Sequence, residues 1–133
     1  MKKKILIVED DAYVSRMYEH AFKVRGYEVE VSGDGQLAMD TLHSATDLPS
    51  VIALDLILPK MSGADVLTEI KKDQRLKDIP VAILTNSLNT EESKKYLSMS
   101  ADLYLIKFDN SSAEIIDKID ALLASRTSGG KAS

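Results

Sequence analysis

The chain has 133 residues, of which 44% are apolar and 29% are charged; its net charge is −4, and it contains no cysteine. This length suits one domain, and the composition is typical of a folded protein rather than a disordered one. The acidic balance argues against direct binding to nucleic acid or to a membrane surface, and no apolar run is long enough to span a membrane or to act as a secretory signal. Together with the lack of cysteine, these features lead us to expect a cytoplasmic protein.

The first half of the chain alternates between strand and helix patterns. Residues 4–8 (KILIV) form an apolar, β-branched run of strand length. The amphipathic helix that follows is expected to end at Gly26, because glycine commonly closes helices in a left-handed conformation. Residues 27–32 alternate as a half-buried strand does, and residues 36–44 are predicted to form a second helix.

The same alternation continues through the middle of the chain. The run VIALD at residues 51–55 predicts a third strand. Ser62 is a candidate helix cap for a segment that reaches roughly Asp73, and residues 79–85 predict a fourth strand. Asn89 is the candidate cap of a fourth helix.

The C-terminal part contains one more strand and helix. Residues 103–107 (LYLIK) predict the fifth strand, and Ser111 with Glu114 predicts the capping box of the last helix. We expect the domain to occupy residues 1–126, and residues 127–133 (TSGGKAS) to form a flexible tail.

Strands that alternate with helices predict an α/β fold with a doubly wound, five-stranded parallel sheet. In such sheets, ligands bind beyond the carboxyl ends of the strands. The polar residues at those ends are therefore the candidate site: Glu9 and Asp10 after the first strand, Asp55 at the end of the third, Thr85 at the end of the fourth and Lys107 at the end of the fifth.

These residue types fit the chemistry of phosphoryl transfer with a divalent cation. Clustered carboxylates repel one another unless a hard cation such as Mg²⁺ binds between them. A carboxylate can also act as a nucleophile and form an aspartyl phosphate. Lys107 then offers a positive charge, and Thr85 a hydroxyl donor, to the phosphoryl oxygens.

Four motifs resemble the receiver domain of two-component response regulators, the CheY-like fold: ILIVEDD, ALDLILPKMSG, VAILTN and ADLYLIK. The resemblance extends in order and spacing from Lys4 to Ala124. It implies the strand order 2-1-3-4-5, counted along the chain.

The resemblance also implies a phosphoacceptor and a metal site. Asp55 matches the aspartate that accepts the phosphoryl group. Glu9 and Asp10 match the acidic pair that binds Mg²⁺, and Asp10 matches the direct ligand. Asp55 itself and the backbone carbonyl of Ile57 complete the implied metal set.

A signalling switch is the implied function. Thr85 matches the switch hydroxyl, Lys107 the lysine that contacts the phosphate, and Tyr104 the aromatic residue that changes rotamer on activation. The donor would be a sensor histidine kinase or a phosphotransfer protein. The output would be a change in the face formed by the fourth helix, the fifth strand and the last helix, read by a downstream protein or by an effector domain outside this sequence. We therefore expect a switch rather than an enzyme.

Some positions depart from the family pattern. Phe108 follows the lysine where the family usually has proline, so we expect a trans peptide bond there. Asn86 is larger than the usual residue after the threonine, and Ser100 replaces a frequent glycine. These changes leave open how long a phosphate on Asp55 persists.

Other interpretations remain open at this stage. Each polar residue has a structural alternative: Asp55 as a loop anchor, Glu9 and Asp10 as acids at a helix start, Lys107 as a solvated surface residue. A pseudo-receiver, which binds partners without phosphorylation, would share the fold. An aspartate-nucleophile phosphatase lacks support, because Ile57 stands where its second aspartate belongs. A flavin site is disfavoured by the acidic loop after the first strand.

Overall fold

The computed structural model describes residues 3–86 and 101–132. Within these ranges a single five-stranded sheet has the order β2-β1-β3-β4-β5, and all neighbouring strands run parallel. Its strands are β1 (Lys4–Val8), β2 (Glu28–Ser32), β3 (Val51–Asp55), β4 (Val81–Thr85) and β5 (Leu103–Ile106). The predicted fold class and strand order are confirmed.

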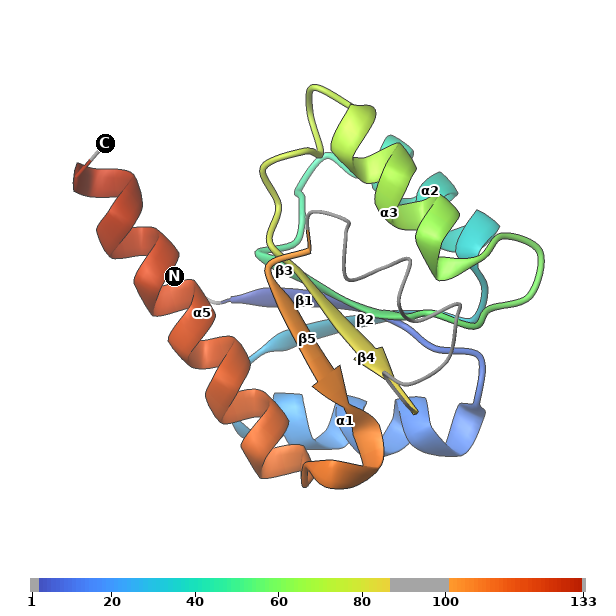
Figure 1. Cartoon of the computed structure of the whole chain (residues 1–133), viewed down its shortest axis with the longest axis horizontal. Helices are drawn as coiled ribbons and strands as arrows, with labels where there is room; N and C mark the ends of the chain where they lie inside the picture. Colours follow the sequence, from blue (N-terminus) through green and yellow to red (C-terminus); the bar gives the residue numbers. More distant parts are fainter. Residues whose placement is uncertain (1–2, 87–100, 133) are drawn as a thin grey trace.

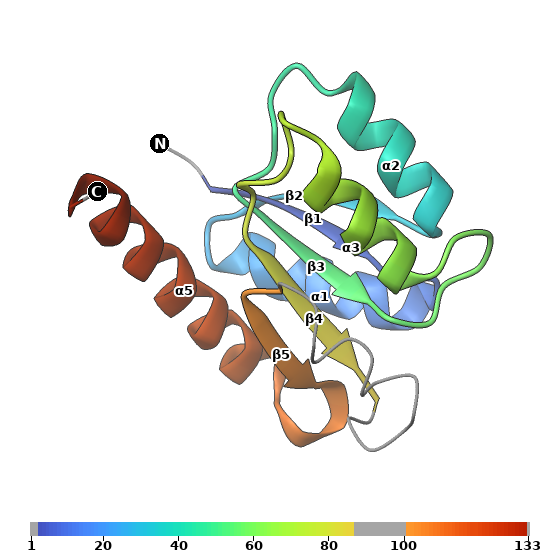
Figure 2. The same cartoon turned by 45° about the horizontal axis from the view of Figure 1, so that its top comes forward.

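Helices cover both faces of the sheet (Figure 1). Those described are α1 (Ala12–Val24), α2 (Gly35–Ser44), α3 (Gly63–Lys72) and α5 (Ser112–Ala132), with a short 3₁₀ turn η1 (Lys107–Asp109). Figure 2 shows α2 and α3 on one side of the sheet and α1 on the other. The predicted helix that begins near Asn89 lies outside the described residues. None of the helices in the described ranges is long and apolar enough to cross a membrane.

Two apolar cores separate the helices from the sheet. Side chains alternate along each strand, so Leu54 packs in the core beneath α2 and α3, while its neighbour Ala53 packs in the core beneath α1 and α5. All five residues of β3 and of β4 are buried, as the centre of a parallel sheet requires. By contrast, β2 alternates between exposed and partly buried residues up to the buried Ser32, which fits its place at the edge.

The helix ends follow the signals in the sequence. Asp11 caps α1 by accepting hydrogen bonds from the backbone N–H groups of Tyr13 and Val14. Ser62 caps α3, and Ser111 and Glu114 form the predicted reciprocal capping box. Gly26 has φ +93°, the left-handed conformation expected of a residue that closes a helix.

The end of the chain differs from the sequence prediction. The last helix was expected to stop near Arg126, with residues 127–133 as a flexible tail, but α5 continues to Ala132. No proline lies within α5 to remove a backbone donor, so the hydrogen-bond ladder can continue through this polar segment. The division of the chain at Arg126 stays a prediction.

Candidate functional site

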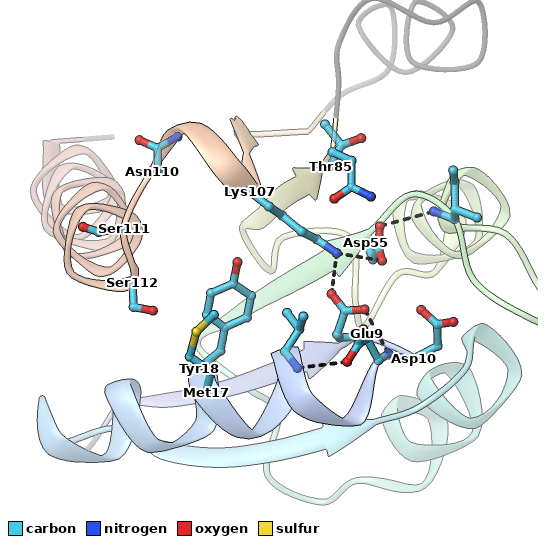
Figure 3. Close-up of a pocket in the computed structure, with 14 residues that line it drawn as sticks. Glu9, Asp10, Met17, Tyr18, Asp55, Thr85, Lys107, Asn110, Ser111 and Ser112 are labelled. Carbon is cyan, nitrogen blue, oxygen red and sulfur yellow. Dashed lines mark hydrogen bonds and ion pairs between the residues drawn. The ribbon is translucent and has the colours of Figure 1, made fainter.

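The carboxyl edge of the sheet brings together residues that are far apart in the sequence. Glu9 follows β1, Asp55 ends β3, Thr85 ends β4 and Lys107 follows β5. All four line one hollow of about 520 Å³, which also includes Asp10. Figure 3 shows the carboxylates of Glu9 and Asp55 facing the Lys107 ammonium. The predicted clustering of these strand-end residues is confirmed.

Lys107 is the electrostatic centre of this hollow. Its Nζ donates a hydrogen bond of 2.9 Å to Asp55 Oδ2 and a second hydrogen bond to Glu9 Oε1. Lys107 and Asp55 are each only 9% exposed, and Glu9 is 4% exposed. Lys107 is therefore a buried, doubly paired cation and not the solvated surface residue of the structural alternative. The strand β5 ends at Ile106, so Lys107 is the first residue of η1 and not the last residue of the strand, as the sequence predicted.

The proton affinities of this cluster reflect burial and pairing. Burial lowers the pKa of Lys107, but its hydrogen bonds to Glu9 and Asp55 outweigh burial, so the pKa lies above its ordinary value. Burial raises the pKa of Glu9, and the hydrogen bond from Lys107 only partly opposes this effect. The backbone N–H of Asp11 holds the other oxygen of Glu9 at 3.1 Å. The single positive charge of Lys107 is therefore shared between two carboxylates, those of Glu9 and Asp55.

The acidic residues are close enough to share a cation. Glu9, Asp10 and Asp55 each present a carboxylate oxygen within 4.8 Å of the others. One lysine cannot neutralise three carboxylates, and an all-oxygen donor set suits a hard divalent ion such as Mg²⁺. The donor set therefore fits the predicted metal. Asp11, the next acid along the chain, is used as the cap of α1.

The loop after β3 fixes the position of Asp55. The backbone N–H of Ile57 donates to Asp55 Oδ1 at 3.4 Å, and Gly63 N–H donates to Leu56 O at 2.9 Å. A Cβ on Gly63 would lie 2.3 Å from Asp55 O, so only glycine fits where α3 begins. Asp55 is thus held at the end of a buried strand. The Ile57 side chain is 67% exposed at the rim of the hollow, and the role of its carbonyl as a metal ligand stays a prediction.

The two predicted switch residues occupy different places. Thr85 is 5% exposed and lines the hollow beside Asn86. Tyr104 is not among the residues that line the hollow. It pairs with Ile83 of β4 and packs at the margin of the core under α2 and α3, where burial raises its pKa. Its suggested rotamer change stays a prediction.

One wall of the hollow was not predicted as part of the site. Val14, Met17 and Tyr18 of α1 line it, together with residues 110–112 before and at the start of α5. The amphipathic pattern of α1 predicts that one of its faces is buried, and the Tyr18 ring does pack in the core under α1 and α5. That pattern gives no sign that Tyr18 also lines the site.

Together, the fold and the site define a class of protein. A doubly wound sheet carries a buried aspartate, a lysine that contacts it, and an acidic cluster suited to a divalent cation. Such an arrangement places a carboxylate, a group that can act as a nucleophile, beside groups that can stabilise phosphoryl oxygens.

Comparison with known proteins identifies the family. The model of the response regulator receiver domain matches residues 5–120. The chain belongs to this family, and the predicted resemblance is confirmed. As a receiver domain, it is a component of the kind used in two-component signalling.

Over the aligned residues, individual relatives are about a third identical to the chain. It is 37% identical to a probable methanogenesis regulatory protein, FilR2, of Methanothrix harundinacea, over 77% of this chain and 70% of that protein. It is 34% identical to the probable transcriptional regulator ycf27 of Guillardia theta, over 80% of this chain but only 40% of that protein. The chain thus spans about two fifths of the length of several curated relatives it matches.

A solved structure supports the fold. The CheY-like receiver domain protein of Methanospirillum hungatei superposes with a TM-score of 0.85 at 23% identity, covering 97% of this chain and 99% of that one. Such low identity supports the architecture and not a shared partner.

Proposed function

We propose that Asp55 accepts a phosphoryl group from a phosphohistidine of a sensor histidine kinase or of a phosphotransfer protein. The observation that carries this proposal is the pairing of Asp55 with the buried Lys107, next to the carboxylates of Glu9 and Asp10. Three carboxylates around one lysine leave an excess negative charge that a further cation would balance.

Each residue has a distinct part in the proposed transfer. A carboxylate oxygen of Asp55 attacks phosphorus, the new O–P bond forms as the N–P bond breaks, and the histidine nitrogen leaves with the bonding electrons. Lys107 stabilises the phosphoryl oxygens, and Thr85 donates its hydroxyl to one of them. Glu9, Asp10, Asp55 and the carbonyl of Ile57 would hold Mg²⁺, which neutralises charge on the phosphoryl group. The chain would thus promote its own phosphorylation and hydrolysis, as a switch rather than as an enzyme.

The proposed output is a shift between two conformations. Phosphorylation would draw Thr85 toward the site and bias Tyr104, altering the surface around β5, α5 and the segment that begins near Asn89. A downstream protein, or an effector domain in a longer chain, would read that surface. The greater length of a relative such as the probable transcriptional regulator ycf27 supports the second form, an effector domain in a longer chain.

Intact mass spectrometry tests the acceptor directly. With Mg²⁺ and a small phosphodonor such as acetyl phosphate, the wild type is expected to gain one acid-stable, base-labile phosphoryl group. Asp55→Asn should gain none, whereas the matched control Asp65→Asn, at an exposed acid on α3, should behave as the wild type does. A wild type that gains no group would favour the pseudo-receiver interpretation, and the same adduct on Asp55→Asn would show that another residue is the acceptor.

A further inference from the structure

Tyr18 places a phenol in the site that the proposed transfer does not use. The residue is 3% exposed, and its ring packs in the core under α1 and α5. It nevertheless lines the same hollow as Asp55 and Lys107. Figure 3 shows Tyr18 extending from α1 into the hollow, with its hydroxyl on the side of the Lys107 ammonium.

The Tyr18 phenol is buried, and it lies near the charged groups of the site. Burial raises the pKa of Tyr18, and the charges of Lys107, Glu9 and Asp55 act on it in that order of strength. The phenol is therefore a neutral group near neutral pH. Within residues 3–86 and 101–132, no hydrogen bond joins its hydroxyl to another residue, so its oxygen is available as an acceptor.

Lys107 has one ammonium hydrogen without a hydrogen-bond acceptor among the described residues. An ammonium group carries three donors, and Lys107 uses two of them for Glu9 and Asp55. No third partner for Nζ is found among the described residues. The hollow between Lys107 and Tyr18 is roomy enough for water, and a polar contact longer than a hydrogen bond is commonly bridged by one.

We propose that Tyr18 is a positioning residue for Lys107: one bridging water accepts the third ammonium hydrogen and donates a hydrogen bond to the Tyr18 hydroxyl oxygen, which fixes the direction in which Lys107 faces Asp55. The inference rests on the proposed phosphorylation of Asp55, because the consequence is kinetic. Lys107 must keep contact with the phosphoryl oxygens as they move from donor to acceptor. A lysine side chain is flexible, and a third restraint at its tip reduces the positions that the ammonium can take.

A double-mutant cycle tests this inference. Tyr18→Phe keeps the ring in the core and removes only the hydroxyl. It is expected to slow phosphorylation by acetyl phosphate about three- to tenfold, the effect of losing one hydrogen bond. In a Lys107→Met background, Tyr18→Phe should have no further effect, because the group that it positions is gone. Rates are measured with Mg²⁺, below the thermal midpoint of every variant.

A matched control comes from the opposite end of the sheet. Tyr27 is also 3% exposed, and its hydroxyl donates to Asp120, away from the hollow. Tyr27→Phe should leave the phosphorylation rate unchanged. A Tyr18→Phe effect that persists in full in Lys107→Met, or a Tyr18→Phe rate equal to that of the wild type, would overturn the inference.

A second measurement needs no variant of Lys107. Exchange of the Lys107 ammonium hydrogens with solvent, followed by ¹⁵N NMR, should speed up in Tyr18→Phe and stay unchanged in Tyr27→Phe; equal exchange in all three proteins contradicts the bridge. The two proposals fail in different ways. A wild type that accepts no phosphoryl group would overturn the proposed function and this inference with it, whereas normal phosphorylation of both wild type and Tyr18→Phe would overturn the inference alone.

Discussion

The two edges of the sheet use charged side chains in different ways. At the carboxyl edge, the paired side chains of Lys107, Glu9 and Asp55 are between 4% and 12% exposed. At the amino edge, Arg25 pairs with Asp117 of α5, and these side chains are 37% and 66% exposed. Both edges carry ion pairs, but only the pairs at the carboxyl edge are buried away from water.

The difference in burial indicates that the ion pairs at the two edges have different roles. A buried charge loses hydration, so a buried pair adds little net stability, yet the loss of one partner is strongly unfavourable. An exposed pair is screened by water and salt and contributes little in either direction. The ion pairs at the carboxyl edge therefore fix the positions of the charged groups rather than add net stability. The amino edge fastens α5 with contacts that each matter little.

Removal of the central lysine should produce the largest difference between the edges. Lys107→Met leaves Glu9 and Asp55 buried without their cation, so we expect the free energy of unfolding at neutral pH to fall by about 3 kcal/mol. Lys3→Met removes a half-exposed lysine that lies 3.6 Å from Asp120 and should change it by less than about 1 kcal/mol. Urea denaturation without divalent ions measures both. Equal losses in the two variants would show that burial does not distinguish the edges.

Magnesium should stabilise the protein through the carboxyl edge alone. At a Mg²⁺ concentration ten times its dissociation constant, the wild type should gain about 1 kcal/mol, seen as a higher thermal midpoint. Asp10→Ala should gain far less, because it removes one of the three clustered carboxylates. Asp117→Ala, at the amino edge, is the matched control and should respond as the wild type does. Equal shifts in wild type and Asp10→Ala would reject the metal assignment.

At high pH, we expect Tyr27 at the amino edge to change the free energy of unfolding. Burial and the hydrogen bond to Asp120 raise the pKa of Tyr27 above its ordinary value of 10.0. The folded protein therefore keeps this proton where the unfolded chain loses it, so the contribution is complete below pH 10 and is lost as pH rises further. We expect the loss to add about 1 kcal/mol per pH unit above pH 10.

Tyr27→Phe should flatten this alkaline decline, as followed by denaturant titrations at successive pH values. Tyr18 and Tyr104 also have raised pKa values, so part of the decline should remain. Tyr13→Phe, at a phenol that is 79% exposed, is the control and should leave the decline as it is in the wild type. A decline of the same steepness in Tyr27→Phe would show that Tyr27 does not govern the alkaline behaviour of this edge.

Much of the fold could be predicted because its signals are local. The apolar run 51–55 needs no partner to be recognised as a buried strand, and Ser111 with Glu114 marks a helix start by hydrogen bonds that span three residues. The end of α5 was less predictable. Small polar residues after Arg126 favour a tail, but they do not forbid a helix, and α5 continues to Ala132.

The candidate site was predictable for a topological reason. In a parallel sheet all strands end at the same edge, so Glu9, Asp55, Thr85 and Lys107 had to lie together once the strands were located. Tyr18 was not predictable in this way. Its position on α1 identifies a buried face, but its place in the same hollow as Lys107 depends on how α1 packs across the sheet.

The sequence by itself determined the order of the elements, the strand ends that carry charge and the caps that begin the helices, because these depend on neighbouring residues and on one rule of sheet topology. Only the tertiary structure decided that Lys107 is buried between Glu9 and Asp55, that Gly63 touches the backbone of Asp55, and that the phenol of Tyr18 faces the same hollow. Apart from the approach of Gly63 to Asp55, which spans one loop, those contacts join residues that are far apart in the chain, and their distances follow from packing, which no local pattern encodes.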